Sequence, residues 1–368
     1  MKKNLIVAAV SSSFAIATHA QSSVTLYGAV DAGLTYTSNV HGNSNWQQTS
    51  GNLSQSRWGL KGSENLGGGL KAVFQLESGF NLGNGTYANN GAEFNRQAFV
   101  GLSGNYGTVT LGRQYDAVQD YLAPLTATGS WGGTAFAHLG NLDNLNTNGG
   151  FSTNNTIKFA SANYAGLTFG GTYGFSNTAG QFANNRAYSL GAAYQRQGLR
   201  VGAAYGQQNN PGNNTSGAVT GATSIASGAY RQREFGVGAG YAFGPAQAGL
   251  AWTQSRADNV AGSSGSVRSN NYEVNGKYNL TPALGLGVAY TFTDLRSDLN
   301  GTDESARYHQ IGTQADYSLS KRTDVYAQVV YQHASSGHNA YIYNPTSGSG
   351  ASSSQNQTAA TVGVRHSF

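Results

Sequence analysis

Residues 116–153 read DAVQDYLAPLTATGSWGGTAFAHLGNLDNLNTNGGFST, and this stretch decides how the rest of the chain is interpreted. It keeps neither the two-residue period of a strand nor the 3.6-residue period of a helix. On both sides it is flanked by segments of about ten residues with alternating hydrophobicity. A connection this long inside a compact array is usually functional or disordered. We therefore expect a β-barrel in which this loop folds inward and narrows a water-filled pore.

The flanking segments read as strands with one dry and one wet face. In residues 24–36, Val24 and Leu26 alternate with Thr25 and Tyr27. The same alternation recurs at 188–194, 199–205, 272–280 and 284–292. Successive side chains of a strand point to opposite faces, so each segment separates apolar from polar residues. This pattern predicts an all-β protein.

The connections between these strands alternate in length. Long polar connections are expected at 38–54, 82–93, 116–153, 177–185, 207–229, 257–270, 297–306 and 335–356. Short ones are expected at 65–69, 104–107, 163–166, 196–198, 243–246, 280–283 and 319–322. Eight long and seven short connections join sixteen strands. An even number of antiparallel strands, with short turns at one rim and long loops at the other, is typical of outer-membrane barrels. Both termini then lie at the short-turn, periplasmic rim.

The composition supports a membrane barrel. Charged residues make up 10% of the chain, whereas soluble domains carry about 25%. The mean hydropathy is negative, and beyond the first twenty residues no apolar run approaches the ~18 residues of a membrane-spanning helix. The absence of cysteine excludes a disulfide framework and thiol chemistry. A secreted, soluble all-β protein of low charge remains an alternative at this point.

Residues 1–20 have the organisation of a secretory signal peptide. Lys2 and Lys3 form a basic start, residues 5–17 are apolar, and Ala20 occupies a small position before the expected cleavage site. The mature barrel is then expected to span residues 21–368, in the cell outer membrane. A formal net charge of +5 is mild and does not indicate a nucleic-acid partner.

Four runs of sequence resemble the general diffusion porins of Gram-negative bacteria, especially the β-proteobacterial type. They are SSVTLYGAVDAGL (22–34), SRWGLKGSENLGGGLKAVFQLESGF (56–80), FNRQAFVGLSGNYGTVTLGRQYD (94–116) and the terminal VGVRHSF (362–368). The resemblance implies a homotrimer of sixteen-stranded barrels in outer-membrane lipid and lipopolysaccharide. It also implies that the third external loop folds inward at mid-height, and that the final strand ending in Phe368 serves barrel assembly.

The resemblance also implies a charged constriction. Arg57 (in SRWG), Arg96 (FNRQAF), Arg113 (LGRQ) and Lys158 (NTIKF) match basic wall positions of the family, and Glu77 (LESGF) matches an acidic one. Asp116 and Asp120 are the candidate acids of the inward loop. Because basic residues outnumber acidic ones on the wall, we expect passive passage of ions and small hydrophilic solutes with weak to moderate anion preference.

Strand parity agrees with most of these positions. It places Arg57, Lys61, Lys71, Glu77 and Lys158 on wet faces. Arg113, however, shares parity with Val109 and Leu111, so simple alternation would send it to the lipid. Charge facing lipid at mid-membrane costs about 2–4 kcal/mol. We therefore expect that the strand ends by residue 112 or that a β-bulge turns Arg113 inward.

No catalytic, metal or cofactor site emerges. The glycine-rich stretches 236–240 and 285–287 lie in alternating strands, so we interpret them as sites of close packing rather than nucleotide binding. Four scattered histidines lack metal-ligand spacing: His309, His333, His338 and His366. Two alternatives to a general pore stay open. One is a substrate-specific channel, with Tyr121 and Trp131 as hints of an aromatic lining, and the other is a plugged barrel acting as an adhesin or structural protein.

Overall fold

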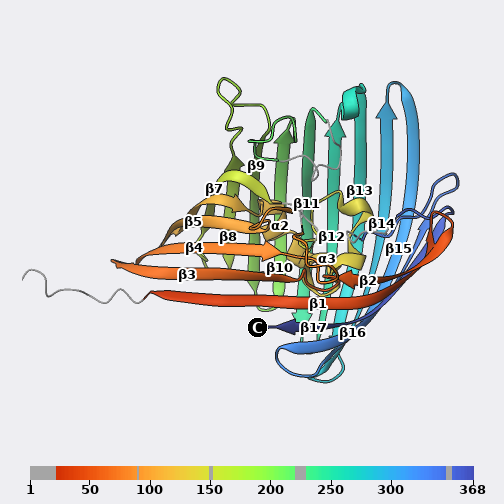
Figure 1. Ribbon diagram of the computed structural model, residues 1–368, viewed down its shortest axis with the longest axis horizontal. Helices are drawn as coiled ribbons and strands as arrows, with labels where there is room; N and C mark the ends of the chain where they lie inside the picture. Colours follow the sequence, from red (N-terminus) through yellow and green to blue (C-terminus); the bar gives the residue numbers. More distant parts are fainter. Residues whose placement is uncertain (1–21, 89–90, 149–151, 220–228, 345–349) are drawn as a thin grey trace, which may run out of the picture.

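The chain folds into one antiparallel sheet that closes on itself as a barrel (Figure 1). The structure, a computed structural model, describes residues 22–88, 91–148, 152–219, 229–344 and 350–368. The predicted signal peptide, residues 1–20, lies outside the described residues.

The wall consists of seventeen strand segments. They are β1 (Ser23–Val40), β2 (Asn43–Ser50), β3 (Arg57–Gly67), β4 (Leu70–Gly79), β5 (Gln97–Gly104), β6 (Gly107–Gln114), β7 (Thr153–Ser161), β8 (Leu167–Gly174), β9 (Arg186–Arg196), β10 (Leu199–Asn209), β11 (Arg231–Phe243), β12 (Ala246–Asp258), β13 (Gly265–Asn279), β14 (Leu284–Leu299), β15 (Thr302–Ser318), β16 (Thr323–Ala334) and β17 (Asn356–Ser367).

Strand β1 closes the barrel. On one side it pairs with β17, from Ala29↔Ser367 to Thr37↔Ala359. On the other side its first half pairs with β3 and its second half with β2. Since β2 and β3 both pair with the same edge of β1, they are two parts of one strand that is interrupted at residues 51–56. The barrel therefore has sixteen strands, and the count made from the sequence is confirmed.

Three of the connections predicted to be long are short. The turns between β1 and β2, β12 and β13, and β14 and β15 occupy residues 41–42, 259–264 and 300–301. Polar residues there continue the ladders, as in the pair Asp298↔Asp303. A ladder is made by backbone groups, so polar side chains on both faces of a hairpin end do not prevent pairing. The loops predicted at these polar hairpin ends were therefore too long.

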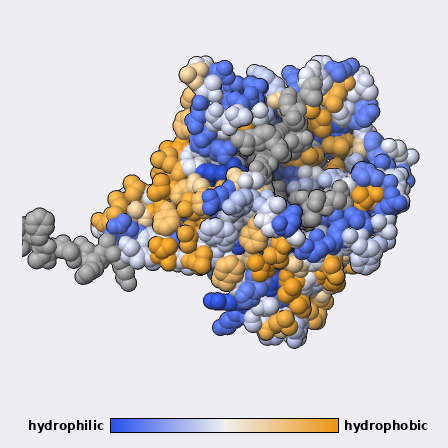
Figure 2. Space-filling model, in the orientation of Figure 1, coloured by the Kyte–Doolittle hydropathy of each residue, from blue (hydrophilic) through white to orange (hydrophobic). Residues whose placement is uncertain are grey.

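The two faces of the wall differ as the alternation predicted. Val237, Leu250 and Val274 are 50%, 58% and 55% exposed on the outer face, while Glu234 and Glu273 are buried on the inner face. Figure 2 shows apolar side chains gathered over the outer wall at the left and bottom of the view, and hydrophilic residues toward the loop-bearing ends. The barrel therefore presents an apolar outside and a polar inside.

In the third long connection, residues 115–148 fold into short helical turns inside the ring of strands (Figure 1). These are α2 (Ala117–Tyr121), η2 (Ala123–Leu125), α3 (Ala127–Ser130), η3 (Thr134–Phe136) and η4 (Leu139–Asn141); η6 (Val260–Gly262) lies elsewhere. Asp116 caps α2 and Thr126 caps α3 through their side chains. No helix in the described ranges is long and apolar enough to cross a bilayer.

Glycines of the inner wall make room for the apolar side chains of this loop. A Cβ atom added to Gly191 would lie 2.5 Å from the ring of Tyr121, and one added to Gly287 would lie 2.3 Å from Trp131. Gly312 leaves the same kind of room for Phe136. The glycine-rich stretches do serve close packing, but the partner of Gly287 is the loop rather than a neighbouring strand.

Candidate functional site

An acid–base cluster lies on the inner wall where β3, β4 and β5 meet. The Glu77 carboxylate accepts from Arg96 Nε at 2.7 Å and lies 3.6 Å from Arg57 Nε. The Tyr27 hydroxyl donates to the same carboxylate at 2.9 Å. Arg57 opens β3, Glu77 lies near the end of β4, and Arg96 directly precedes β5. The structure thus brings these three predicted residues together.

Arg96 connects this cluster to the loop. Its guanidinium donates to the Thr147 carbonyl at 2.9 Å and to the side chain of Gln55, and its own carbonyl accepts from Ser152 Oγ at 2.5 Å. Only 5% of its side chain is exposed, against 27% for Arg57. Arg96 therefore holds the end of the loop against the wall, while Arg57 presents charge to the lumen.

A second ion pair joins β7 to the loop. Lys158 Nζ lies 2.5 Å from Asp120 Oδ2 and donates to the Tyr115 carbonyl at 3.0 Å. The neighbours of Lys158 in sequence, Ile157 and Phe159, are exposed on the outer face, so the parity prediction for Lys158 is confirmed. Side-chain exposures of 15% for Lys158 and 30% for Asp120 leave this pair in contact with solvent.

Asp116 has a capping role. Its carboxylate accepts from the Gln119 backbone N–H at 2.9 Å at the start of α2, and the residue is 6% exposed. Burial, together with the nearby charge of Asp120, raises the pKa of Asp116 to about 6. The Asp116 carboxylate is therefore buried as the N-cap of α2, whereas the Asp120 carboxylate is partly exposed to solvent.

Arg113 lies at a break in register, as one of the two expected explanations requires. The strand does not end by residue 112, since β6 continues to Gln114, but its pairing with β7 shifts between Gly112 and Gln114. The Arg113 guanidinium donates to the Asn95 carbonyl at 2.9 Å and to the Asn154 side chain. Among the described residues no carboxylate pairs with Arg113, so it stands apart from the two ion-paired groups.

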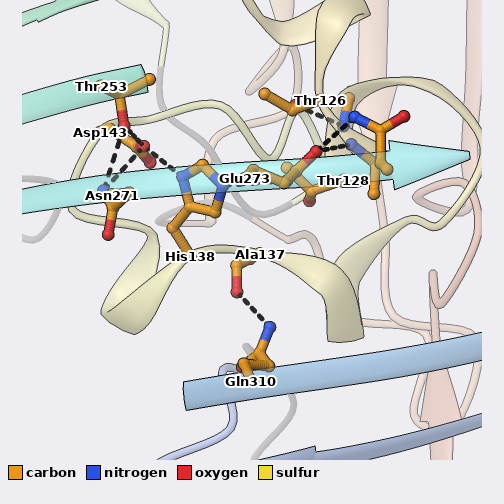
Figure 3. A network of polar contacts seen from close by, with 12 residues as sticks. Thr126, Thr128, Ala137, His138, Asp143, Thr253, Asn271, Glu273 and Gln310 are labelled. Atoms are coloured by element: carbon orange, nitrogen blue, oxygen red, sulfur yellow. Dashed lines mark hydrogen bonds and ion pairs between the residues drawn. The ribbon is translucent and has the colours of Figure 1, made fainter. Parts of the chain in front are cut away.

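A buried charge network between the loop and β13 was not predicted from the sequence (Figure 3). His138 Nδ1 lies 2.6 Å from Asp143 Oδ2, and His138 Nε2 lies 2.9 Å from Glu273 Oε2. Burial disfavours the imidazolium, but Asp143 and Glu273 outweigh it and raise the pKa of His138 to about 10. His138 is therefore doubly hydrogen-bonded and positively charged at neutral pH.

Further polar groups complete this network. Asp143 also accepts from Thr253 and Asn271, and Glu273 accepts from Asn275 and from the Ala127 N–H at the start of α3. Both imidazole nitrogens are occupied, so His138 is a structural residue rather than a metal ligand. No spacing in the sequence predicts this network, because Glu273 lies 135 residues away from His138.

Basic side chains also line the open spaces at the short-turn side of the loop. Lys61 and Lys158 border a cavity of about 440 Å³ between β1 and β7. Arg200 borders a second cavity, of about 200 Å³, beside Pro124 and Leu125 of the loop. Parity had placed Lys61 on the wet face without assigning it to the site. Arg200 was missed, although the exposed outer residues Leu199 and Val201 on either side of it carry the same signal.

The chain and its fold are similar to known outer-membrane proteins. The family model for Gram-negative porins matches residues 6–337. An outer membrane porin protein of Bordetella pertussis is 31% identical, and the outer membrane porin protein 32 of Delftia acidovorans is 30% identical, each over the full length of both chains. The structure is similar to the anion-selective porin from Comamonas acidovorans, with a TM-score of 0.76 and 26% identity over 95% of this chain and 100% of that one. It shares the fold of OmpT from Vibrio cholerae in its trimer form, with a TM-score of 0.65 and 20% identity over 94% and 99% of the two chains.

Proposed function

The chain belongs to the Gram-negative porin family, and from this premise we propose that its loop and wall charges form a constriction with weak to moderate anion preference. As a porin it is a multi-pass outer-membrane protein and a channel for passive diffusion, not an enzyme. The proposal concerns how its residues select among the ions and small hydrophilic solutes that pass.

The observation that carries the proposal is the excess of positive charge in the two ion-paired groups that join the wall to the loop. Arg57, Arg96 and Lys158 face only Glu77 and Asp120 in the two ion-paired groups. Lys61 and Arg200 add positive charge beside the cavities. A positive potential in a narrow low-dielectric passage raises the local anion concentration. The relative described as an anion-selective porin has the same fold.

We assign the narrowing of the pore to residues 116–153. This loop is anchored through Arg96, Lys158 and the His138 network to three separate parts of the wall. Tyr121 and Trp131, the hints of an aromatic lining, pack against Gly191 and Gly287 instead. Their role as anchors removes the support for a substrate-specific channel and favours a general pore.

We propose a homotrimer embedded in outer-membrane lipid and lipopolysaccharide as the working form. The trimeric OmpT relative and the apolar outer wall support this assembly. Single-channel recordings in a planar bilayer provide the measurement, since three identical pores close in three equal current steps. Single steps from protein of monomeric mass would contradict the trimer.

Ion selectivity tests the charge assignment directly. The reversal potential of the purified protein under a potassium chloride gradient is expected to have the sign of anion preference. The double variant Arg57→Glu/Lys61→Glu inverts two charges in the lumen. It is expected to shift the reversal potential toward that of a cation-selective pore. Arg96 is a poor choice for this test, because its substitution would also release the loop.

The matched control is Lys321→Glu/Arg322→Glu, which makes the same charge change in the exposed turn between β15 and β16. It is expected to leave the sign of selectivity unchanged. If Arg57→Glu/Lys61→Glu conducts normally and keeps the wild-type reversal potential, the assignment of these residues to the selectivity of the pore is wrong.

A further inference from the structure

Four arginines form a row across the outer wall of β11–β14. Arg233 pairs in register with Arg256, Arg256 with Arg268, and Arg268 with Arg296. Adjacent strands lie about 4.8 Å apart, so the row spans about 14 Å. The arginines share parity with the exposed outer residues Val237, Leu250, Val274 and Val288, so the row faces away from the lumen.

The row lies directly beyond a band of aromatic residues. On the same face, Phe235 packs against Trp252 with ring centroids 5.6 Å apart, and Tyr272 packs against Phe292 at 6.1 Å. Aromatic girdles of this kind mark the membrane interface in outer-membrane barrels. The arginines follow on the side away from the chain termini, toward the hairpin ends at 259–264 and 300–301. They therefore lie at the level of lipid headgroups on the outer side.

Protein carboxylates do not balance the row. Like charges directly opposite each other destabilise a sheet. Asp258 pairs with Arg231, Arg233 and Arg256 at 2.8–3.0 Å, and Asp294 pairs with Arg296. Arg268, between Arg256 and Arg296, has no acidic partner within the described ranges, and its buried Nε lacks a hydrogen-bond acceptor. An anion from outside the chain would satisfy Arg268.

An apolar groove lies beside the end of the row that Arg233 forms. It covers the outer face of β7–β10, encloses about 910 Å³, and is lined by apolar and aromatic side chains that include Phe159, Phe169, Leu190 and Tyr205. The Tyr205 hydroxyl donates to Gln207, which pairs with Arg233 of the row. A ligand with both an acyl chain and a phosphate would therefore match the groove and the arginines together.

We propose that the arginine row binds the phosphate groups of a phosphorylated glycolipid of the outer leaflet, with an acyl chain lying in the adjoining groove. Arginine forks match phosphate oxygens in bidentate geometry, which makes arginine better suited than lysine to this contact. The inference rests on the proposed function, because it takes the loop-bearing rim to face outside the cell.

The test compares three probes on the purified full chain in detergent. Bis-phosphorylated lipid A is expected to bind tightly, dephosphorylated lipid A more weakly, and inorganic phosphate at only far higher concentrations. The variant Arg256→Gln/Arg268→Gln/Arg296→Gln is expected to bind lipid A at least about tenfold more weakly, since charge-assisted hydrogen bonds to phosphate are lost. Isothermal titration calorimetry measures all three probes.

The matched control, Arg196→Gln/Lys321→Gln/Arg322→Gln, removes three exposed charges near the opposite rim and is expected to bind lipid A as the wild type does. Equal binding by the arginine-row variant, or equal binding of phosphorylated and dephosphorylated lipid A, would overturn the proposal. Inorganic phosphate competing at lipid A concentrations would do the same. Conductance is measured separately. An arginine-row variant that conducts normally but binds lipid A more weakly supports the lipid site independently of the pore, and a wild type that binds lipid A without conducting contradicts only the proposed function.

Discussion

At the residue scale, inward-facing side chains divide into those that hold the loop and those that face the lumen. Gln310, Gln314 and Gln328 donate to the loop carbonyls of Ala137, Trp131 and Gly132 at 2.6–3.1 Å. Buried carbonyls without a partner are costly, so these amides stabilise the docked loop. Arg57 belongs to the other class, because much more of its side chain than that of Arg96 reaches solvent.

The wall glycines give a prediction at this scale. Gly287→Ala places a methyl group against the rigid Trp131 ring, and overpacking of this kind costs about 1–3 kcal/mol. We expect a lower free energy of unfolding in urea and faster proteolysis of the loop. Gly285→Ala is the matched control on the same strand, because its Cβ would meet the flexible end of Lys277. Equal effects of the two substitutions would contradict the close packing of the Trp131 ring against Gly287.

At the scale of elements, the loop and the break between β2 and β3 belong together. The break at 51–56 is where the loop docks: Thr134 N–H donates to the Asn52 carbonyl at 2.7 Å, and the Gln55 N–H donates to Asn148 at 2.9 Å. Asp31 on β1 accepts from the backbone N–H groups of Leu53 and Ser54. Residues 51–56 do not pair with a neighbouring strand. Their backbone groups form hydrogen bonds with the loop and with Asp31 instead.

The His138 network predicts how loop anchoring depends on pH. The pKa of His138 is raised from 6.5 to about 10 in the folded protein, so its stabilising effect is fully present below pH 6.5 and is lost as the pH rises through about 10. We expect the wild type to unfold at higher urea concentration than His138→Gln near neutral pH. The difference between the two should shrink toward pH 11.

The control for this measurement is His333→Gln, which removes a partly exposed histidine outside the loop whose Nδ1 bonds the Asn356 side chain. Its difference from the wild type is expected to stay constant between pH 7 and 11. A His138→Gln difference that also stays constant over this range would show that the imidazolium does not anchor the loop.

At the scale of the whole molecule, one sheet separates two environments. The outer face carries aliphatic side chains such as Val274, and the inner face carries carboxylates, amides and glycines that contact the loop. The loop reaches the wall at points that range from the break before β3 and Arg96 beside β5 to β15 and β16. The loop thus cross-links distant parts of the barrel, and the barrel in turn gives the loop its shape.

A charge placed on either face tests this separation. Val274→Arg puts a guanidinium on the lipid-facing side and is expected to lower the free energy of unfolding in phospholipid vesicles by about 2–4 kcal/mol. Gln247→Arg, on the inner face beside the cavity that Arg200 lines, is the matched control and is expected to have little effect on stability. Equal losses for the two variants would contradict the assignment of the faces.

The sequence by itself determined the strand count, the two faces of the wall and the family, because alternation is a local property of the chain and motifs such as SRWG and LGRQ are typical of the family. It also predicted that Arg57, Glu77 and Arg96 share one site, and that Lys158 points inward. Parity settles orientation but not contact, so it left open which charges are free and which are paired.

Only the tertiary structure decided those contacts. His138 meets Glu273 across 135 residues, and Trp131 meets Gly287 across a similar separation, so no local period carries either contact. The polar hairpin ends and the arginine row were missed for a related reason: ladder pairing is made by backbone groups, and its register emerges only when neighbouring strands align. Contacts set by closure of the barrel cannot be read from one segment at a time.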